Sequence, residues 1–392
     1  MGGDFYLSDK AVRQLKVYVQ MDDVNIDFLL DTVSLKQVIR NPNWRAEADQ
    51  RIEWLRKQDV DIRVLSPPGI EPSDVQVLVQ MTRHHFPFGS AIVADRISGS
   101  GPTDQRYQEV FYDNFEWAVF ENAMKWQIME RNQYDIRFER VDNALIELLA
   151  RDIPVRGHCL YWNVDERNAD WLKEMSEEQM DIEMQRRMDY MLDHYREDIV
   201  HWDVNNEQLH GRFFEEGSGR YDVLAAMFRE AHRLAPETMM FLNDFNVVNN
   251  GNSAIALLNT VTELQQRGAV VDGLGVQSHF TGVVDIDIVA KRLDVLAEMG
   301  IPIYSTELDI TLLDRNLRAD NYENVLRLFY SYPAVHGIIL WGFWEGTHWR
   351  PDAALWEGED IMVSNVFFLI ADLSLISCLL SYLCSSMIFS VH

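Results

Sequence analysis

The sequence predicts an α/β fold, a (β/α)8 TIM barrel, on two observations. Short apolar segments alternate with longer amphipathic ones along most of the chain, which is typical of a parallel sheet wrapped by helices. Distinctive polar and aromatic residues stand at or just after the ends of these apolar segments, where barrel enzymes place their active sites. With 392 residues, the chain has room for one such barrel and a smaller unit.

The individual elements follow from periodicity and from stop signals. The expected strands cover residues 89–93, 117–121, 155–161, 199–204, 239–243, 273–277, 303–307 and 337–341. The expected helices cover residues 104–115, 136–151, 177–197, 221–234, 253–267, 287–299 and 321–332. Gly268, Gly300 and Pro302 stand where helices are expected to stop. An eighth helix is not evident.

Composition excludes several classes of protein. The formal net charge of -27 argues against nucleic-acid binding and against adhesion to anionic membranes. The cysteines Cys159, Cys378 and Cys384 form no disulfide framework, and Cys159 is expected in the core. Since the sequence carries no nucleotide, haem or zinc signature, we expect no cofactor and no metal.

The last part of the sequence, residues 361–392, is an unusual apolar tail. Asp372 is the only formal charge between residues 361 and 391. That length can span a bilayer, but the run contains several serines and is followed by no basic flank. A membrane anchor, a packed helix and unrelated sequence in place of a terminal helix all stay open, and the last is favoured over an anchor.

Two glutamates are the residues that best indicate a catalytic site. Glu207 and Glu307 each lie at the end of an expected buried strand, a poor place for a carboxylate that serves stability only. Cleavage of a glycosidic bond needs two such groups, one to protonate the leaving oxygen and one to meet the sugar carbon.

The residues around both glutamates resemble the signatures of glycoside hydrolase family 10, the retaining xylanases. The sequence W-D-V-N-N-E covers residues 202–207, and T-E-L-D-I covers residues 306–310. Further matches follow in the order of the family: E-N-A-M-K-W at 121–126, R-G-H at 156–158, N-D-F-N at 243–246, G-V-Q-S-H at 275–279, and W-G at 341–342 with a tryptophan at 349.

The resemblance implies a role for each matching residue. Glu207 would be the general acid/base, Glu307 the nucleophile, and His279 and Asp309 the pair that orients the nucleophile. The residues implied to bind substrate are Glu121, Asn122, Lys125, His158, Trp162, Asn206, Gln277, Trp341 and Trp349. The tryptophans offer flat faces for sugar rings.

Some positions depart from the common family pattern. Asn163 stands where most bacterial members have histidine, and Phe245 replaces a common tyrosine. Residues 343–348 also differ from the usual loop. The motifs around residues 205–206 and 243–246 look closer to the plant and animal branch.

Four segments are expected. Residues 1–35 resemble the last strands of a carbohydrate-binding β-sandwich module and form too short a piece to fold alone. Residues 36–74 are a linker with a helix at 46–57 and a strand at 60–65, and a further strand-like stretch covers 75–81. Residues 75–360 are the catalytic barrel, and residues 361–392 are the apolar tail.

The expected function is retaining hydrolysis of the xylan backbone. An endo-β-1,4-glucanase and a carbohydrate-binding protein inactivated by truncation stay as alternatives. The expected partner is a polysaccharide, with a membrane only if the 361–391 run is a true anchor. The resemblance implies an extracellular protein, although residues 1–7 show no signal peptide; we therefore expect that the natural N-terminus is missing.

Overall fold

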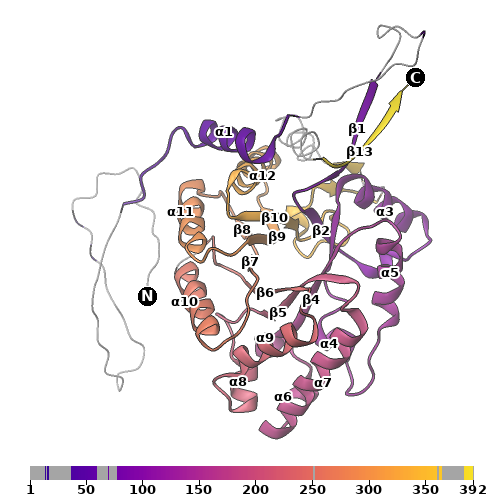
Figure 1. Cartoon of the computed structure of the whole chain (residues 1–392), viewed down its shortest axis with the longest axis vertical. Helices are drawn as coiled ribbons and strands as arrows, with labels where there is room; N and C mark the ends of the chain where they lie inside the picture. The colour runs from indigo at the N-terminus through magenta and orange to yellow at the C-terminus, as the bar shows by residue number, and fades with distance from the viewer. Residues whose placement is uncertain are drawn as a thin grey trace.

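Eight parallel strands close into a barrel surrounded by helices (Figure 1). The computed structural model describes residues 37–59, 77–249, 252–359, 362–363 and 384–391, together with residues 14, 16 and 69. The strand order is β10-β2-β3-β4-β5-β6-β7-β9, and β10 pairs with both β2 and β9, which closes the ring. This is the (β/α)8 TIM barrel that the sequence predicts.

Every expected barrel strand is present. The barrel strands are β2 (Phe88–Ile92), β3 (Trp117–Phe120), β4 (Val155–Trp162), β5 (Ile199–Asn206), β6 (Met239–Asp244), β7 (Gly273–Val276), β9 (Ile303–Thr311) and β10 (Val335–Leu340). A short extra strand, β8 (His279–Thr281), pairs with the far end of β9. Ser278 has a φ of 62° between β7 and β8, so the chain turns there before β8 resumes the pairing.

The helices of the ring also agree with the periodicity. They are α3 (Pro102–Asn114), α5 (Glu139–Leu149), α7 (Glu177–Tyr195), α9 (Val223–Leu234), α10 (Ser253–Gln266), α11 (Ile286–Ala297) and α12 (Arg315–Ser331). Shorter helices α2 (Ala94–Ile97), α4 (Trp126–Met129), α6 (Asp170–Lys173) and α8 (Phe213–Ser218) lie in the connections. The main difference is α12, which begins at Arg315 rather than at residue 321, because the Asp314 side chain accepts a hydrogen bond from the Leu317 amide and caps it earlier.

The amino-terminal end of the barrel is filled by aromatic rings. The His201 ring lies 4.9 Å from the Phe241 ring and 5.1 Å from the Tyr304 ring. A Cβ on Gly273 would come within 2.2 Å of the Phe241 ring, and one on Gly337 within 2.4 Å of Tyr304, so neighbouring strands need glycine there. This end is therefore a packed core, and the open mouth for chemistry lies at the carboxyl ends of the strands.

The helix expected at 46–57 is α1 (Trp44–Arg56), and it packs against α12 (Figure 1). Buried Ile52 joins the main core. The Arg56 guanidinium donates hydrogen bonds to the carbonyls of Tyr330 at 2.9 Å and Val335 at 2.8 Å, so it ties the end of α1 to the end of α12 and the start of β10. This part of the expected linker is thus attached to the barrel.

The strand before the barrel and the last described strand meet in one ribbon. Strand β1 (Val77–His84) pairs antiparallel with β13 (Cys384–Val391), outside the barrel. After β10 come only η3 (Pro351–Ala353), β11 (Trp356–Glu357) and β12 (Met362–Val363) among the residues described before β13. Apart from residues 14 and 16, the β-module expected at 1–35 lies outside the described residues, as do the strand at 60–65 and most of the apolar tail. Within the described residues, no helix is both long and apolar enough to cross a membrane.

Candidate active site

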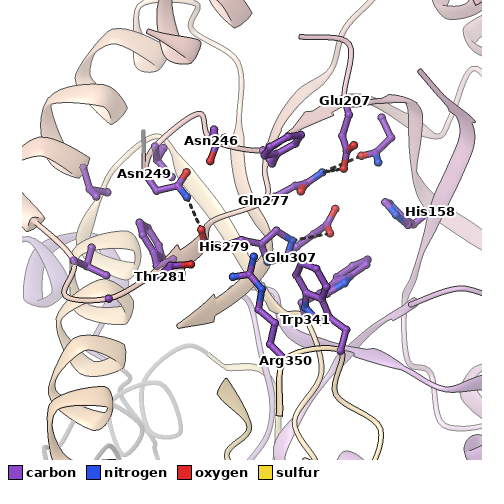
Figure 2. A pocket seen from close by; sticks show the side chains of 18 of the residues that line it. His158, Glu207, Asn246, Asn249, Gln277, His279, Thr281, Glu307, Trp341 and Arg350 are labelled. Carbon is purple, nitrogen blue, oxygen red and sulfur yellow. Dashed lines mark hydrogen bonds and ion pairs between the residues drawn. The ribbon is translucent and has the colours of Figure 1, made fainter. Parts of the chain in front are cut away.

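A cleft of about 1000 Å³ opens at the carboxyl ends of the barrel strands (Figure 2). All but one of the site residues expected from the sequence line this cleft, although they come from six barrel strands or the segments that follow them. The exception is Asp309, which is fully buried directly behind His279. The structure therefore brings together a set of residues that the sequence spreads over more than 200 positions.

Glu207 stands just after β5 in a strained backbone conformation. Its φ is 63°, in the left-handed region that non-glycine residues rarely adopt, and such strain gathers at functional sites. Its carboxylate accepts hydrogen bonds from Trp162 Nε1 at 2.7 Å and Gln277 Nε2 at 3.2 Å. Burial raises the pKa of Glu207 in spite of these two bonds, and the negative charge of Glu307 adds to the rise. The group is thus held closer to the protonated form than an ordinary glutamate.

Glu307 lies within β9 and is only 4% exposed. Its carboxylate accepts a hydrogen bond from Asn243 Nδ2 at 2.7 Å and faces His279 Nε2 at 3.3 Å (Figure 2). Burial alone would raise the pKa of Glu307, but the nearby His158, His279 and Lys125 outweigh it, and the pKa is lowered. Two carboxylates in one cleft are therefore driven toward opposite protonation states.

His279 connects the Glu307 carboxylate to a second, buried one. Its Nδ1 lies 3.0 Å from Asp309 Oδ1, because β8 pairs with β9 with His279 opposite Asp309. Burial opposes a charge on this imidazole, yet Asp309 and Glu307 raise its pKa to about 9. Asp309 also accepts hydrogen bonds from Trp349 Nε1 at 2.7 Å and Arg350 at 3.2 Å. The imidazole is therefore held as a cation beside Glu307.

A network of amides fixes the floor of the cleft between the two glutamates. Asn243 Nδ2 also donates to Asn206 Oδ1 at 2.9 Å, and Gln277 Nε2 donates to the same oxygen at 3.2 Å. The Asn243 oxygen accepts from Thr306 Oγ1 at 2.6 Å. Buried Asn206 Nδ2 has no hydrogen-bond partner among the described residues. Since a buried donor rarely stays unpaired, this N–H is available to a bound hydroxyl.

Glu121, Asn122 and Lys125 lie together after β3 and line the same cleft. The Lys125 ammonium donates to Asn122 Oδ1 at 2.9 Å and lies 4.7 Å from the ring centre of Trp162. It also lies 5.8 Å from the ring centre of Trp341. Burial lowers the pKa of Lys125, whereas burial raises the pKa of Glu121. This end of the cleft thus combines partly desolvated charges with indole faces, which suits sugar hydroxyls and ring C–H groups.

His158 sits in the middle of β4 with its ring orientation fixed by a buried carboxylate. Its Nδ1 lies 2.9 Å from Asp203 Oδ2, and Asp203 also bonds Arg156. The pairing register of β4 and β5 places His158 directly beside Asp203. With Nδ1 engaged there, the other edge of the imidazole is the one left for the cleft that His158 lines.

Several site residues were not assigned a role from the sequence. Asn243 belongs to the N-D-F-N motif, and the motif alone does not predict that its side chain donates a hydrogen bond to Glu307. Arg350 follows Trp349 and lines the cleft beside Asp309, and Asn246, Asn249 and Thr281 extend the cleft beyond His279 (Figure 2). The asparagine-rich stretch at 243–252 is the available signal for Asn246 and Asn249.

Two departures from the family pattern have clear surroundings. Asn163 is fully buried and donates to the Gly211 carbonyl at 2.9 Å and to Glu215 at 2.9 Å, so it holds the loop after Glu207. Phe245 stacks on His210 with ring centres 3.6 Å apart, at the rim of the cleft. Neither side chain forms a hydrogen bond with Glu207 or Glu307 in the described structure.

Known proteins resemble this chain in both sequence and structure. Endo-1,4-beta-xylanase 1 of Arabidopsis thaliana is 32% identical over 365 residues, which are 92% of this chain and 37% of that protein. Anti-sigma-I factor RsgI6 of Acetivibrio thermocellus is 34% identical over 323 residues, which are 82% of this chain and 40% of that protein. The chain therefore spans less than half the length of these curated relatives.

Solved structures share the barrel. Xylanase 10B from Thermotoga petrophila, solved with xylobiose, has a TM-score of 0.68 at 21% identity and covers 75% of this chain and 95% of its own. The intracellular xylanase TsXylA from Thermoanaerobacterium saccharolyticum has a TM-score of 0.66 at 25% identity, with 73% and 95% covered. Residues 77–367 match the model of glycosyl hydrolase family 10, and the chain belongs to that family.

Proposed function

We propose that the chain is an endo-β-1,4-xylanase that hydrolyses xylan with retention of configuration. The observation that carries the proposal is the pair Glu207 and Glu307, which share one cleft and have pKa values moved in opposite directions. A retaining glycosidase needs one carboxyl group that keeps its proton and one that stays ionised.

The proposed reaction has two steps. Ionised Glu307 attacks the anomeric carbon while Glu207 gives its proton to the departing glycosidic oxygen, which leaves a covalent glycosyl-enzyme. Glu207, now a carboxylate, then takes a proton from water as the water breaks that ester bond, and Glu307 leaves. The cation on His279 keeps Glu307 ionised before the attack, and the free Asn206 Nδ2 is placed to bond a hydroxyl of the same sugar. This reaction uses two carboxyl groups and needs no cofactor.

Trp349 supports xylose over glucose as the sugar that binds next to Glu307. Its indole ring centre lies 4.9 Å from that of His279, and its Nε1 is bonded to Asp309, so the ring is fixed beside the nucleophile. A glucose unit carries a hydroxymethyl group that xylose lacks, and a fixed indole crowds that group. The endo-β-1,4-glucanase alternative is the less favoured one for this reason.

The relatives support the proposal by name, since several carry the name endo-1,4-beta-xylanase. One relative carries a different kind of name, anti-sigma-I factor. Binding of polysaccharide without turnover stays as the alternative that an activity assay must exclude. The extracellular location expected from the resemblance stays a prediction.

The test is the release of reducing ends from xylan and from carboxymethyl cellulose. We expect turnover of xylan, much slower turnover of cellulose, and a loss of roughly 10⁴-fold or more in Glu307→Gln, because removal of a nucleophile abolishes the covalent route. Glu237→Gln is the matched control, since Glu237 is exposed in the connection before β6, at the opposite end of the barrel. Equal turnover of both polymers would overturn the xylan assignment, and no turnover of either would favour the binding protein.

A further inference from the structure

A short turn after β4 carries an arginine to the rim of the cleft. The turn is η2 (Asp165–Arg167), and buried Asn168 anchors it by donating to the carbonyls of Trp162 at 2.7 Å and Val164 at 2.9 Å. Because Asn168 ties the turn back to the end of the strand, the position of the Arg167 backbone is well defined relative to the catalytic cleft.

The Arg167 guanidinium lies against the indole of Trp162, 5.1 Å from its ring centre. Trp162 is the same residue that donates its Nε1 hydrogen to Glu207. A guanidinium that stacks on a ring uses its flat face and leaves the N–H groups at its edge free for an acceptor. Arg167 therefore presents donors at a point separated from the acid/base by a single side chain.

Arg167 differs from the other cations that line the cleft. Arg350 pairs with Asp309, and Arg292 donates to the Val248 carbonyl at 2.9 Å. Lys125 is buried and donates to Asn122. Arg167 is exposed and makes no ion pair with a carboxylate among the described residues, although Asp165 and Glu166 precede it in the same turn. It is thus a cation that keeps its charge available to a ligand.

A second cation stands close by. The Lys125 ammonium lies 4.7 Å from the centre of the same Trp162 ring. Burial lowers the pKa of Lys125, the carboxylates of Glu307 and Glu121 raise it, and the charge of Arg167 adds a smaller lowering. Lys125 and Arg167 therefore repel each other in the free protein. A ligand carboxylate beside them would relieve this repulsion. An anion should therefore bind more favourably here than at an isolated surface arginine.

We infer that Arg167 binds the carboxylate of a uronic acid branch on the xylan backbone, so that the preferred substrate is an acidic, substituted xylan. The inference rests on the proposed function, since it concerns the substrate of the same cleft. The net charge of -27 repels a polyanion at long range, but at physiological salt that repulsion is screened beyond about 8 Å. Over the shorter distances within the cleft, a carboxylate beside Arg167 meets a cation that has no carboxylate partner among the described residues.

The experiment measures binding by titration calorimetry with the full chain carrying Glu307→Gln, so that no ligand is hydrolysed. The probes are a linear xylo-oligosaccharide and the same oligosaccharide with one glucuronic acid branch. We expect the branched probe to bind about fivefold more tightly than the linear one at low salt, the upper range for one exposed ion pair. The preference should fall toward one in 0.5 M NaCl because salt screens that pair.

Added Arg167→Gln should remove the preference for the acidic probe, and Arg167→Lys should keep part of it. Arg131→Gln is the matched control, because Arg131 is also exposed, does not line the cleft and makes no ion pair in the described part of the chain; it should leave the preference unchanged. Equal affinity of the parent for both probes, or a preference that survives Arg167→Gln, would overturn the inference.

The outcome is separable from that of the proposed function. Turnover of linear xylan by the unmutated chain tests the xylanase assignment and does not involve a carboxylate on the substrate. Binding in the Glu307→Gln chain tests Arg167 even if the unmutated chain turns over nothing. A protein that binds both probes equally but hydrolyses xylan would keep its function and lose only this inference.

Discussion

The hydrogen bond from Trp162 to Glu207 should set the alkaline limit of activity. Its donor–acceptor distance is 2.7 Å, and it favours the ionised form of Glu207, so it opposes the rise in pKa that burial causes. Trp162→Phe keeps an aromatic ring and removes only the N–H donor. Without that donor the carboxyl group is harder to ionise, so the pKa of Glu207 should rise further.

The expected size of the shift follows from the energy of one hydrogen bond. A bond to a charged group contributes about 1.5 kcal/mol, and one pKa unit corresponds to about 1.4 kcal/mol. Glu207 keeps its second bond, from Gln277 at 3.2 Å, so the shift is about one unit. Because the reaction needs protonated Glu207, a higher pKa extends activity to higher pH.

The assay is the pH profile of kcat/KM on an unactivated xylo-oligosaccharide, since a good leaving group needs no acid. The alkaline limb of Trp162→Phe should lie about one pH unit above that of the parent, whatever the change in absolute rate. Trp341→Phe is the control, because it changes another indole of the cleft that makes no hydrogen bond to Glu207 in the described structure. An alkaline limb that stays in place, or moves to lower pH, would refute the reasoning.

Three further results are expected. Glu307→Ala should be rescued by azide to give a glycosyl azide of inverted configuration, whereas Glu207→Ala should keep its first step on activated aryl glycosides; the reverse behaviour would exchange the two roles. Arg56→Ala should lower the free energy of unfolding by about 2–3 kcal/mol, because it leaves two carbonyls without the charged donor between α1 and the barrel; unchanged urea unfolding would count against that tie. Deletion of residues 384–391 should expose the edge of β1 and increase self-association, visible by light scattering, since that strand pairs with β13.

The barrel was predictable because each of its strands and helices has a recognisable pattern in the local sequence. Each strand is a short apolar run and each helix has an apolar face, so eight strands were located to within a few residues. The start of α12 was missed because Arg315, Asn316 and Arg318 show no apolar periodicity, and its signal is the single cap at Asp314. The role of α1 was missed for another reason, since packing against α12 depends on tertiary contacts.

The candidate site was predictable only as a set of residues. Motifs at strand ends identified Glu207, Glu307 and their neighbours, and barrel geometry predicted that they meet. The bond between Trp162 and Glu207 depends on the register of β4 and β5, in which Trp162 lies beside Asn206. Likewise, Asp309 lies behind the cleft because β9 continues past Glu307 to Thr311. Such contacts join residues far apart in sequence, and no local pattern carries them.

The most direct test of the central claim is the configuration of the first product. Proton magnetic resonance of a xylo-oligosaccharide, followed from the moment of mixing, distinguishes the two anomers before they interconvert. If Glu307 forms a covalent intermediate that Glu207 helps water to open, the new reducing end appears first as the β-anomer and converts slowly to the equilibrium mixture. First appearance of the α-anomer would mean direct attack by water and would contradict the assigned roles of both glutamates.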